Sequence, residues 1–167
     1  NGTILTSSAE AENNVQGPIG IYWYVRNPGH DIEFNGVSYG GNDIFVAVGV
    51  EGLVNTSTDG KIWANQVILI ADPSAIELNS VIFIGGSFAS VGNGGKIFNG
   101  PPNGTYWYEI NHELDKDLNG LTYANGLVVG VGVDGTFITS SDETLTHKET
   151  ADLSLHNLDD DTDVTVN

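Results

Sequence analysis

Three oxygen-bearing side chains at alternate positions have the spacing of a calcium-binding loop. They are Asp115, Asp117 and Asn119, and Gly120 follows them where such loops use glycine for a sharp turn. The twelfth position of the loop is Gly126, whereas complete calcium loops place a bidentate glutamate there. The alternative interpretation is an ordinary turn with an acidic approach, and the sequence leaves both open.

A denser acidic cluster lies towards the C-terminal end, at Asp159, Asp161 and Asp163. Carboxylates this close together repel one another unless a cation or water screens them. One interpretation is a Ca²⁺ site at a terminus or between domains, and the other is a solvated charged segment. No other cofactor is expected, because the chain has no cysteine and its four histidines lack the paired spacing of a zinc site.

Two aromatic runs have a composition suited to binding sugars. The runs are Tyr22, Trp23 and Tyr24, and Tyr106, Trp107 and Tyr108. Exposed rings of this kind can stack on the C–H face of a sugar while nearby polar groups bind its hydroxyls. In the alternative interpretation, alternate rings of a strand point into the core and the others face a neighbouring sheet or subunit.

Composition limits the fold and the partners. The chain has 167 residues, 22 of them glycine, and a formal net charge of −17. Frequent glycine disfavours helices and favours many tight turns between short strands. A chain this acidic repels phosphate backbones and anionic lipid surfaces, so nucleic acid and membrane insertion are not expected. Because residue 1 is not methionine, we expect a processed chain or a part of a longer one.

An internal repeat gives the organisation of the chain. Residues 34–77, 78–117 and 118–150 each contain an alternating apolar segment, an apolar run and a glycine-bounded turn. The glycine pairs of these turns are Gly49/Gly52, Gly92/Gly95 and Gly132/Gly135. Residues 1–33 match only the later part of a unit, with a polar loop inserted, and residues 151–167 form an acidic tail, a closing strand or a linker.

Units of about 40 residues with four strands each are typical of propeller blades. We therefore predict an all-β fold, a β-propeller or a propeller-like array of four-stranded antiparallel blades.

The segment from Gly52 to Trp63 resembles the Asp-box, or BNR-type, repeat of bacterial and phage β-propeller proteins. The resemblance implies that Ser57 and Asp59 cap a hairpin between the third and fourth strands. It also implies that Gly60 permits the turn and that Trp63 packs between blades as a buried anchor. These roles agree with the general chemistry of turns, in which Ser and Asp side chains accept hydrogen bonds from backbone N–H groups.

The other units depart from the motif. In the second unit Gly100 stands in the place of the serine and Pro102 in that of the aspartate. The third unit keeps Ser140 and Asp142, and the partial first unit has Ala9 in place of the aspartate. The motif itself is expected to be structural.

The sequence favours a structural function over a catalytic one. Sialidases share this repeat but need a cluster of arginines for the substrate carboxylate, and this chain has Arg26 alone. We expect a non-enzymatic extracellular, cell-surface or virion assembly module, such as a bacterial surface domain or a phage tail or fibre part. Its partners would be other subunits or other domains of the same parent chain. The alternatives are a carbohydrate-binding adhesin module, with a glycan as partner, and a fragment of a glycoside hydrolase whose catalytic residues lie outside this chain.

Overall fold

The computed structural model describes residues 2–8, 20, 22–26, 28–29, 31–140, 153–157 and 164–166, the last two ranges by their backbone alone. These residues form β-strands and three short 3₁₀ helices, which are η1 (Pro73–Ala75), η2 (Asn93–Gly95) and η3 (Val133–Gly135). No helix of the described part is long and apolar enough to cross a membrane.

Four sheets follow one another along the chain, and we call them blades. The partial blade pairs β1 (Ile4–Ser8) with β2 (Tyr22–Arg26). The first blade has four antiparallel strands in sequence order, β3 (Phe34–Gly40), β4 (Ile44–Gly49), β5 (Val54–Ser57) and β6 (Ala64–Asn65).

The second blade repeats this order with one addition. Its antiparallel strands are β8 (Leu78–Ile84), β9 (Ser87–Gly92), β10 (Ile97–Gly100) and β11 (Tyr106–Glu109). A short strand, β7 (Val67–Ile68), pairs in parallel with β11 at the outer edge. The predicted first unit, residues 34–77, therefore gives its last strand to the second blade.

The third blade extends beyond residue 150. It consists of β12 (Leu118–Ala124), β13 (Leu127–Gly132), β14 (Thr136–Ser140), β15 (Leu153–Asn157) and β16 (Val164–Val166). Parts of the expected tail, residues 151–167, thus form the fourth and fifth strands of this sheet. Among the described residues β16 pairs with β15 and belongs to a different sheet from β1, so it does not close a ring with β1.

Tight turns set the strand register within each blade. The turn between β12 and β13 is Asn125–Gly126, and both residues have positive φ, 54° and 77°. This is the backbone of a type I′ turn, whose twist matches that of the flanking strands, and Asn-Gly is its preferred sequence. The first strand of the first, second and third blades also carries one register shift opposite the end of the second strand.

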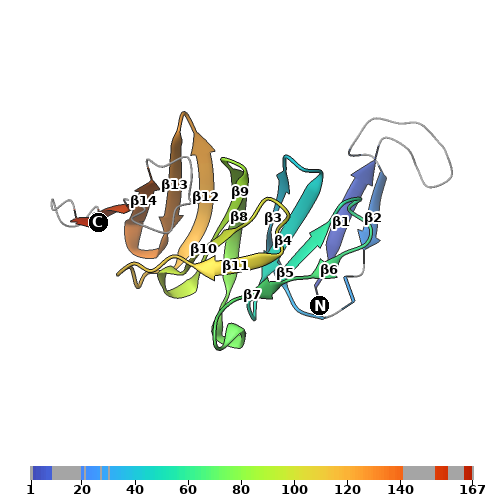
Figure 1. Cartoon of the computed structure of the whole chain (residues 1–167), viewed down its shortest axis with the longest axis horizontal. Helices are drawn as coiled ribbons and strands as arrows, with labels where there is room; N and C mark the ends of the chain where they lie inside the picture. Colours follow the sequence, from blue (N-terminus) through green and yellow to red (C-terminus); the bar gives the residue numbers. More distant parts are fainter. Residues whose placement is uncertain are drawn as a thin grey trace.

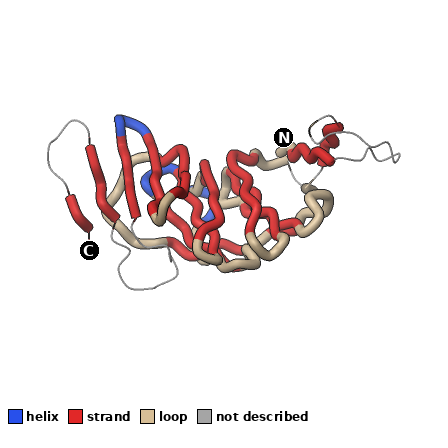
Figure 2. The backbone as a smooth tube through the Cα atoms, turned by 90° about the horizontal axis from the view of Figure 1, so that it is seen from above, coloured by secondary structure: helices blue, strands red, loops and turns tan. Residues whose placement is uncertain are grey.

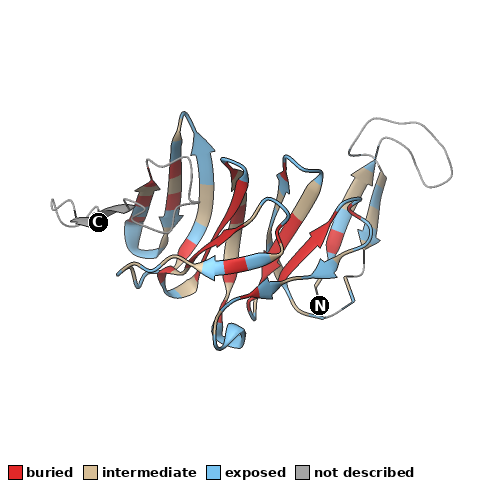
Figure 3. Ribbon diagram, viewed as in Figure 1, coloured by how far each residue is buried: buried red, intermediate tan, exposed pale blue. Residues whose placement is uncertain are grey.

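The blades stand side by side in a row that does not close into a ring (Figures 1 and 2). The first strands lie innermost and adjacent, β3 against β8 and β8 against β12. Buried residues concentrate between the first and second blades, whereas the sheets at the two ends carry exposed residues (Figure 3). The main core includes Val46 and Val48 of the first blade together with Phe88, Phe98 and Trp107 of the second. The first and second blades therefore stabilise each other through their facing sides.

Candidate functional site

The turn between β5 and β6 is held by two side chains. The Ser57 hydroxyl accepts a hydrogen bond from the backbone N–H of Gly60 at 2.8 Å. The Asp59 carboxylate accepts from the backbone N–H groups of residues 61 and 62 at 2.8 and 2.9 Å. These backbone donors hold the pKa of Asp59 below its usual range. The Trp63 indole closes the turn by donating to the Gly60 carbonyl at 3.1 Å.

The second blade has the same turn, displaced by one residue from the predicted alignment. The Trp107 indole donates to the Gly104 carbonyl at 2.9 Å, as Trp63 does to Gly60. The Asn103 side chain accepts from the backbone N–H of Thr105 at 3.3 Å, so Asn103 has the position of the aspartate. The assignment of that position to Pro102 was wrong, because an extra residue precedes the turn.

Glycine in place of serine at position 100 follows from the packing of the indole. A Cβ atom at Gly100 would lie 2.5 Å from Cε2 of Trp107. No side chain fits there while Trp107 keeps its position, because real carbon–carbon contacts are about 3.5 Å or longer.

The partial blade contains a third copy of the turn, divided by an insertion in the sequence. The Ser7 hydroxyl accepts from the backbone N–H of Gly20 at 2.7 Å, and the Trp23 indole donates to the Gly20 carbonyl at 2.8 Å. Residues 8–19 lie between the serine and the glycine. The expected aspartate position, Ala9, lies outside the described residues. A glycine three residues before a tryptophan occurs at each tryptophan of the chain, and this signal could have located all three turns.

Two turn residues were predicted in the third blade, and one of them, Ser140, lies within the described part. Ser140 ends β14 and is buried, and its hydroxyl makes no hydrogen bond to any described residue. Asp142 lies outside the described residues.

The three tryptophans differ in burial, which corrects two predictions. Trp107 is 0% exposed, so it cannot stack on a sugar. Trp63, the expected buried anchor, is only half-buried, and Trp23 is 59% exposed. The difference in burial follows from the part of the neighbouring blade that packs against each ring. Trp107 packs against the complete first blade, whereas Trp63 faces the two-stranded partial blade and Trp23 is at the open end.

The tyrosines of the two aromatic runs remain accessible to different extents. Tyr106 is 60% exposed and Tyr108 38% exposed, while Tyr22 and Tyr24 are half-buried. With Trp107 enclosed in the core, the second run does not form a continuous platform of three rings.

The predicted calcium loop serves contacts between blades. The Asp117 carboxylate accepts from the backbone N–H of Gly94, in the second blade, at 2.7 Å. Among the described residues, no three His, Asp or Glu side chains come together in a way that could hold a metal ion. Asn119 lies within β12 (Leu118–Ala124), and calcium binding by Asp115, Asp117 and Asn119 stays a prediction. Asp159, Asp161 and Asp163 lie outside the described residues.

An asparagine in the first strand of each blade points to the next blade. The Asn35 amide donates to the Leu78 carbonyl at 3.0 Å, and the Asn79 amide donates to the Leu118 carbonyl at 2.9 Å. Asn119 has the equivalent place in the third blade, where it is exposed at the open end. Its repeat position is the one from which Asn35 and Asn79 bond to the next blade.

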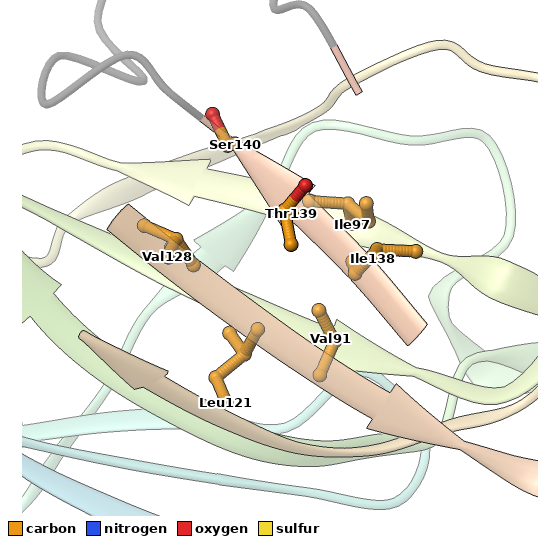
Figure 4. Close-up of a pocket in the computed structure, with 8 residues that line it drawn as sticks. Val91, Ile97, Leu121, Val128, Ile138, Thr139 and Ser140 are labelled. Carbon is orange, nitrogen blue, oxygen red and sulfur yellow. The ribbon is translucent and has the colours of Figure 1, made fainter. Parts of the chain in front are cut away.

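We call the interface between two neighbouring blades a joint. Two of these joints differ greatly in how tightly side chains pack in them. The joint between the second and third blades encloses only about 20 Å³, lined by residues such as Val91, Leu121 and Ile138 (Figure 4). Between the partial blade and the first blade lies a groove of about 470 Å³. It is lined by β1 and by residues of the first blade that include Val37, Phe45 and Trp63. Its volume and its exposed apolar lining make this groove the candidate binding site.

Comparison with solved structures identifies the fold as a β-propeller. The chain is similar to YCF48 bound to D1 peptide, with a TM-score of 0.61, 16% identity, and coverage of 79% of this chain and 51% of that chain. It is similar to the WD40 propeller domain of Doa1, with a TM-score of 0.55, 16% identity, and coverage of 78% and 53%. The computationally designed Ika4 protein matches with a TM-score of 0.52, 12% identity, and coverage of 83% and 92%.

These likenesses confirm the predicted fold class. The chain spans about half the length of the YCF48 and Doa1 chains that it matches. No protein-family model matches the sequence, and no curated protein matches it.

Proposed function

We propose that the chain is a non-catalytic structural module, a block of propeller blades that joins to further protein through its open ends. One observation carries this proposal. Val48, Val91 and Val131 each precede the glycine that ends a second strand, and the first two are 0% exposed while Val131 is 42% exposed. The third blade thus presents a face that its two predecessors bury against a neighbour.

The apolar character of this face supports a protein partner. Phe137 lies beside Val131 on the adjacent strand and is 38% exposed, whereas its repeat counterpart Ile97 is 4% exposed. Covering such a patch with another apolar surface lowers the free energy of the protein in water. YCF48, a structural neighbour, is described as bound to a peptide, and this agrees with a protein-binding role for the fold.

The non-catalytic part of the proposal rests on what the candidate residues do. The Ser, Asp and Trp side chains of the turns bond to backbone groups, and the single arginine is engaged in the partial blade. Arg26 donates to the Thr6 hydroxyl at 2.8 Å and lies over the Tyr24 ring at 5.0 Å. The glycoside hydrolase and glycan-binding alternatives gain no supporting contact from this geometry.

The family and setting are also part of the proposal. The hydrogen bonds of Ser57 and Asp59 support assignment of the repeats to the Asp-box type. We place the protein outside the cell, on a cell surface or in a virion, because the repeats resemble bacterial and phage propellers and the charge of −17 suits a saline surrounding.

Light scattering on the 167-residue chain tests the proposal. We expect a mass above the 17.7 kDa of one copy, with association growing as salt screens the net charge. Val131→Asp should reduce association. Val67→Asp adds the same charge at an exposed residue outside this face and should not. A monodisperse monomer at every protein and salt concentration, with no partner retained by the face, contradicts the proposal.

A further inference from the structure

The partial blade has two strands where the other blades have at least four. In the first blade β4 lies along β5, and in the second β9 lies along β10. Strand β1 corresponds to β5, because Ser7 and Ser57 both accept a hydrogen bond from the glycine of their turn. Among the described residues β1 pairs only with β2. Two inner strand positions beside β1 are therefore unoccupied within the described part of the chain.

The groove of about 470 Å³ lies at these positions. Its lining includes Val37, which is 64% exposed, whereas the counterpart of Val37 in the second blade, Val81, is 5% exposed. Val81 is buried because it packs on the inner strands of the first blade, in the same core cluster as Val46 and Val48. Val37 is exposed because no such strands of the described part lie in front of it.

We propose that this groove binds a β-hairpin with the amino-acid pattern of the first two strands of these blades. The inference rests on the proposed function and names the chemistry of the partner. A free strand edge binds an extended segment through backbone hydrogen bonds, while alternate side chains give specificity. The partner needs a second strand with valines at alternate positions, ending in glycine.

The complete joints give the register of the bound hairpin. In the first blade Val46 lies opposite Thr56 and Val48 opposite Val54, and both valines face the next blade. The equivalent positions on β1 are Thr6 and Ile4. The valines of the bound strand therefore run antiparallel to β1 and pack on Val37, Phe45 and Trp63.

The first strand of the hairpin adds a directional contact. The asparagines of the first and second blades donate to the carbonyls of Leu78 and Leu118. The residue at the same repeat position in the first blade is Phe34, which lines the groove. An asparagine in the first strand of the partner would donate to the Phe34 carbonyl. Basic residues flanking the hairpin would be favoured by the net charge of −17.

The chain contains a suitable probe for this site. Residues 118–132 form the β12–β13 hairpin, whose Asn125–Gly126 turn favours hairpin formation in isolation. A synthetic peptide of these residues with two lysines at each end contains no tryptophan, so excitation of tryptophan reports on the chain alone. Trp63 lines the groove and should shift to shorter emission wavelength when the peptide covers it.

Titration of the chain with this peptide should give saturable 1:1 binding by fluorescence and by calorimetry. Trp63→Phe should remove most of the fluorescence change while calorimetry still detects binding. Val37→Asp should weaken binding at least about tenfold, which corresponds to about 1.4 kcal/mol. Val67→Asp, with the same charge outside the groove, should leave it unchanged. A peptide with Val129→Asp and Val131→Asp should not bind.

Absence of calorimetric binding, equal binding of the aspartate peptide, or full affinity in the Val37→Asp chain would overturn the inference. The outcome is separable from that of the proposed function. The chain variant Val131→Asp changes the far end of the row, so it should bind the peptide normally even where its self-association is lost. Association that needs Val131, together with no peptide binding, would reject the groove inference and leave the proposed function intact.

Discussion

Replacing Trp107 with alanine should destabilise the protein far more than the same change at the two other tryptophans. Trp107 is 0% exposed and packs against Phe88, with 6.2 Å between ring centroids. Truncating a buried tryptophan costs about 3–5 kcal/mol, and the lost indole hydrogen bond to Gly104 is part of that cost.

The same substitution at the other two positions provides internal controls, because all three side chains make the same hydrogen bond to a turn glycine. Trp63 is half-buried beside an open groove, so Trp63→Ala should cost about half as much as full burial, or about 1.5–2.5 kcal/mol. Trp23 is 59% exposed, and Trp23→Ala should change the free energy of unfolding by no more than about 0.5 kcal/mol.

Urea unfolding followed by far-ultraviolet circular dichroism measures these differences without depending on tryptophan emission. With a denaturant dependence of about 2 kcal/mol per molar urea, Trp107→Ala should lower the midpoint by about 2 M. Trp63→Ala should lower it by about half of that. Equal losses at positions 107 and 63, or a larger loss at 63, would refute the difference in packing between the two joints.

Three further changes test other contacts. Gly104→Ala should be more destabilising than Gly86→Ala in thermal melts. Both glycines have positive φ, but a Cβ atom at position 104 would lie 2.8 Å from a side-chain methyl group of the first blade, whereas a Cβ atom at position 86 would meet open space. Asn79→Ala should lower the free energy of unfolding by about 1–2 kcal/mol because it removes two hydrogen bonds, while Asn119→Ala should have almost no effect; equal effects would contradict the role of Asn79 in joining two blades. Burial lowers the pKa of His112, whose Nδ1 accepts a backbone hydrogen bond. The unfolded chain therefore binds a proton at this residue at higher pH than the folded chain does, and stability should fall as the pH drops below about 6.5. His112→Asn should remove that part of the pH dependence.

The repeat was predictable because its signals are local. Glycines at fixed offsets and alternating apolar residues mark each strand and turn, and these features depend only on neighbours in the sequence. The same locality explains the Ser57–Asp59 turn, in which acceptors and donors lie within five residues of one another. The fold class followed from strands of this kind in units of about 40 residues.

The differences among the repeats were not predictable in the same way. The motif of the partial blade is divided between Ser7 and Gly20, so an alignment that allows no insertion continues into the wrong residues. In the second blade one extra residue precedes the turn, so an ungapped alignment assigns the aspartate position to Pro102 instead of Asn103. Local sequence also gives no measure of burial for Trp63 and Trp107, because burial depends on how many strands the preceding blade has.

Contact with the next blade determines how the three apolar strands differ in exposure. Val48, Val91 and Val131 have the same residue type, the same strand position and the same following glycine, so their intrinsic preferences are equal. Their exposures, 0%, 0% and 42%, follow their place in the row. In a row of stacked units, each neighbour contributes one interface, so an end unit lacks the stabilisation of one face. The apolar residues at both ends of the row are therefore exposed because no complete neighbouring blade covers them. They have the same pattern as the residues that pack together in the two internal joints.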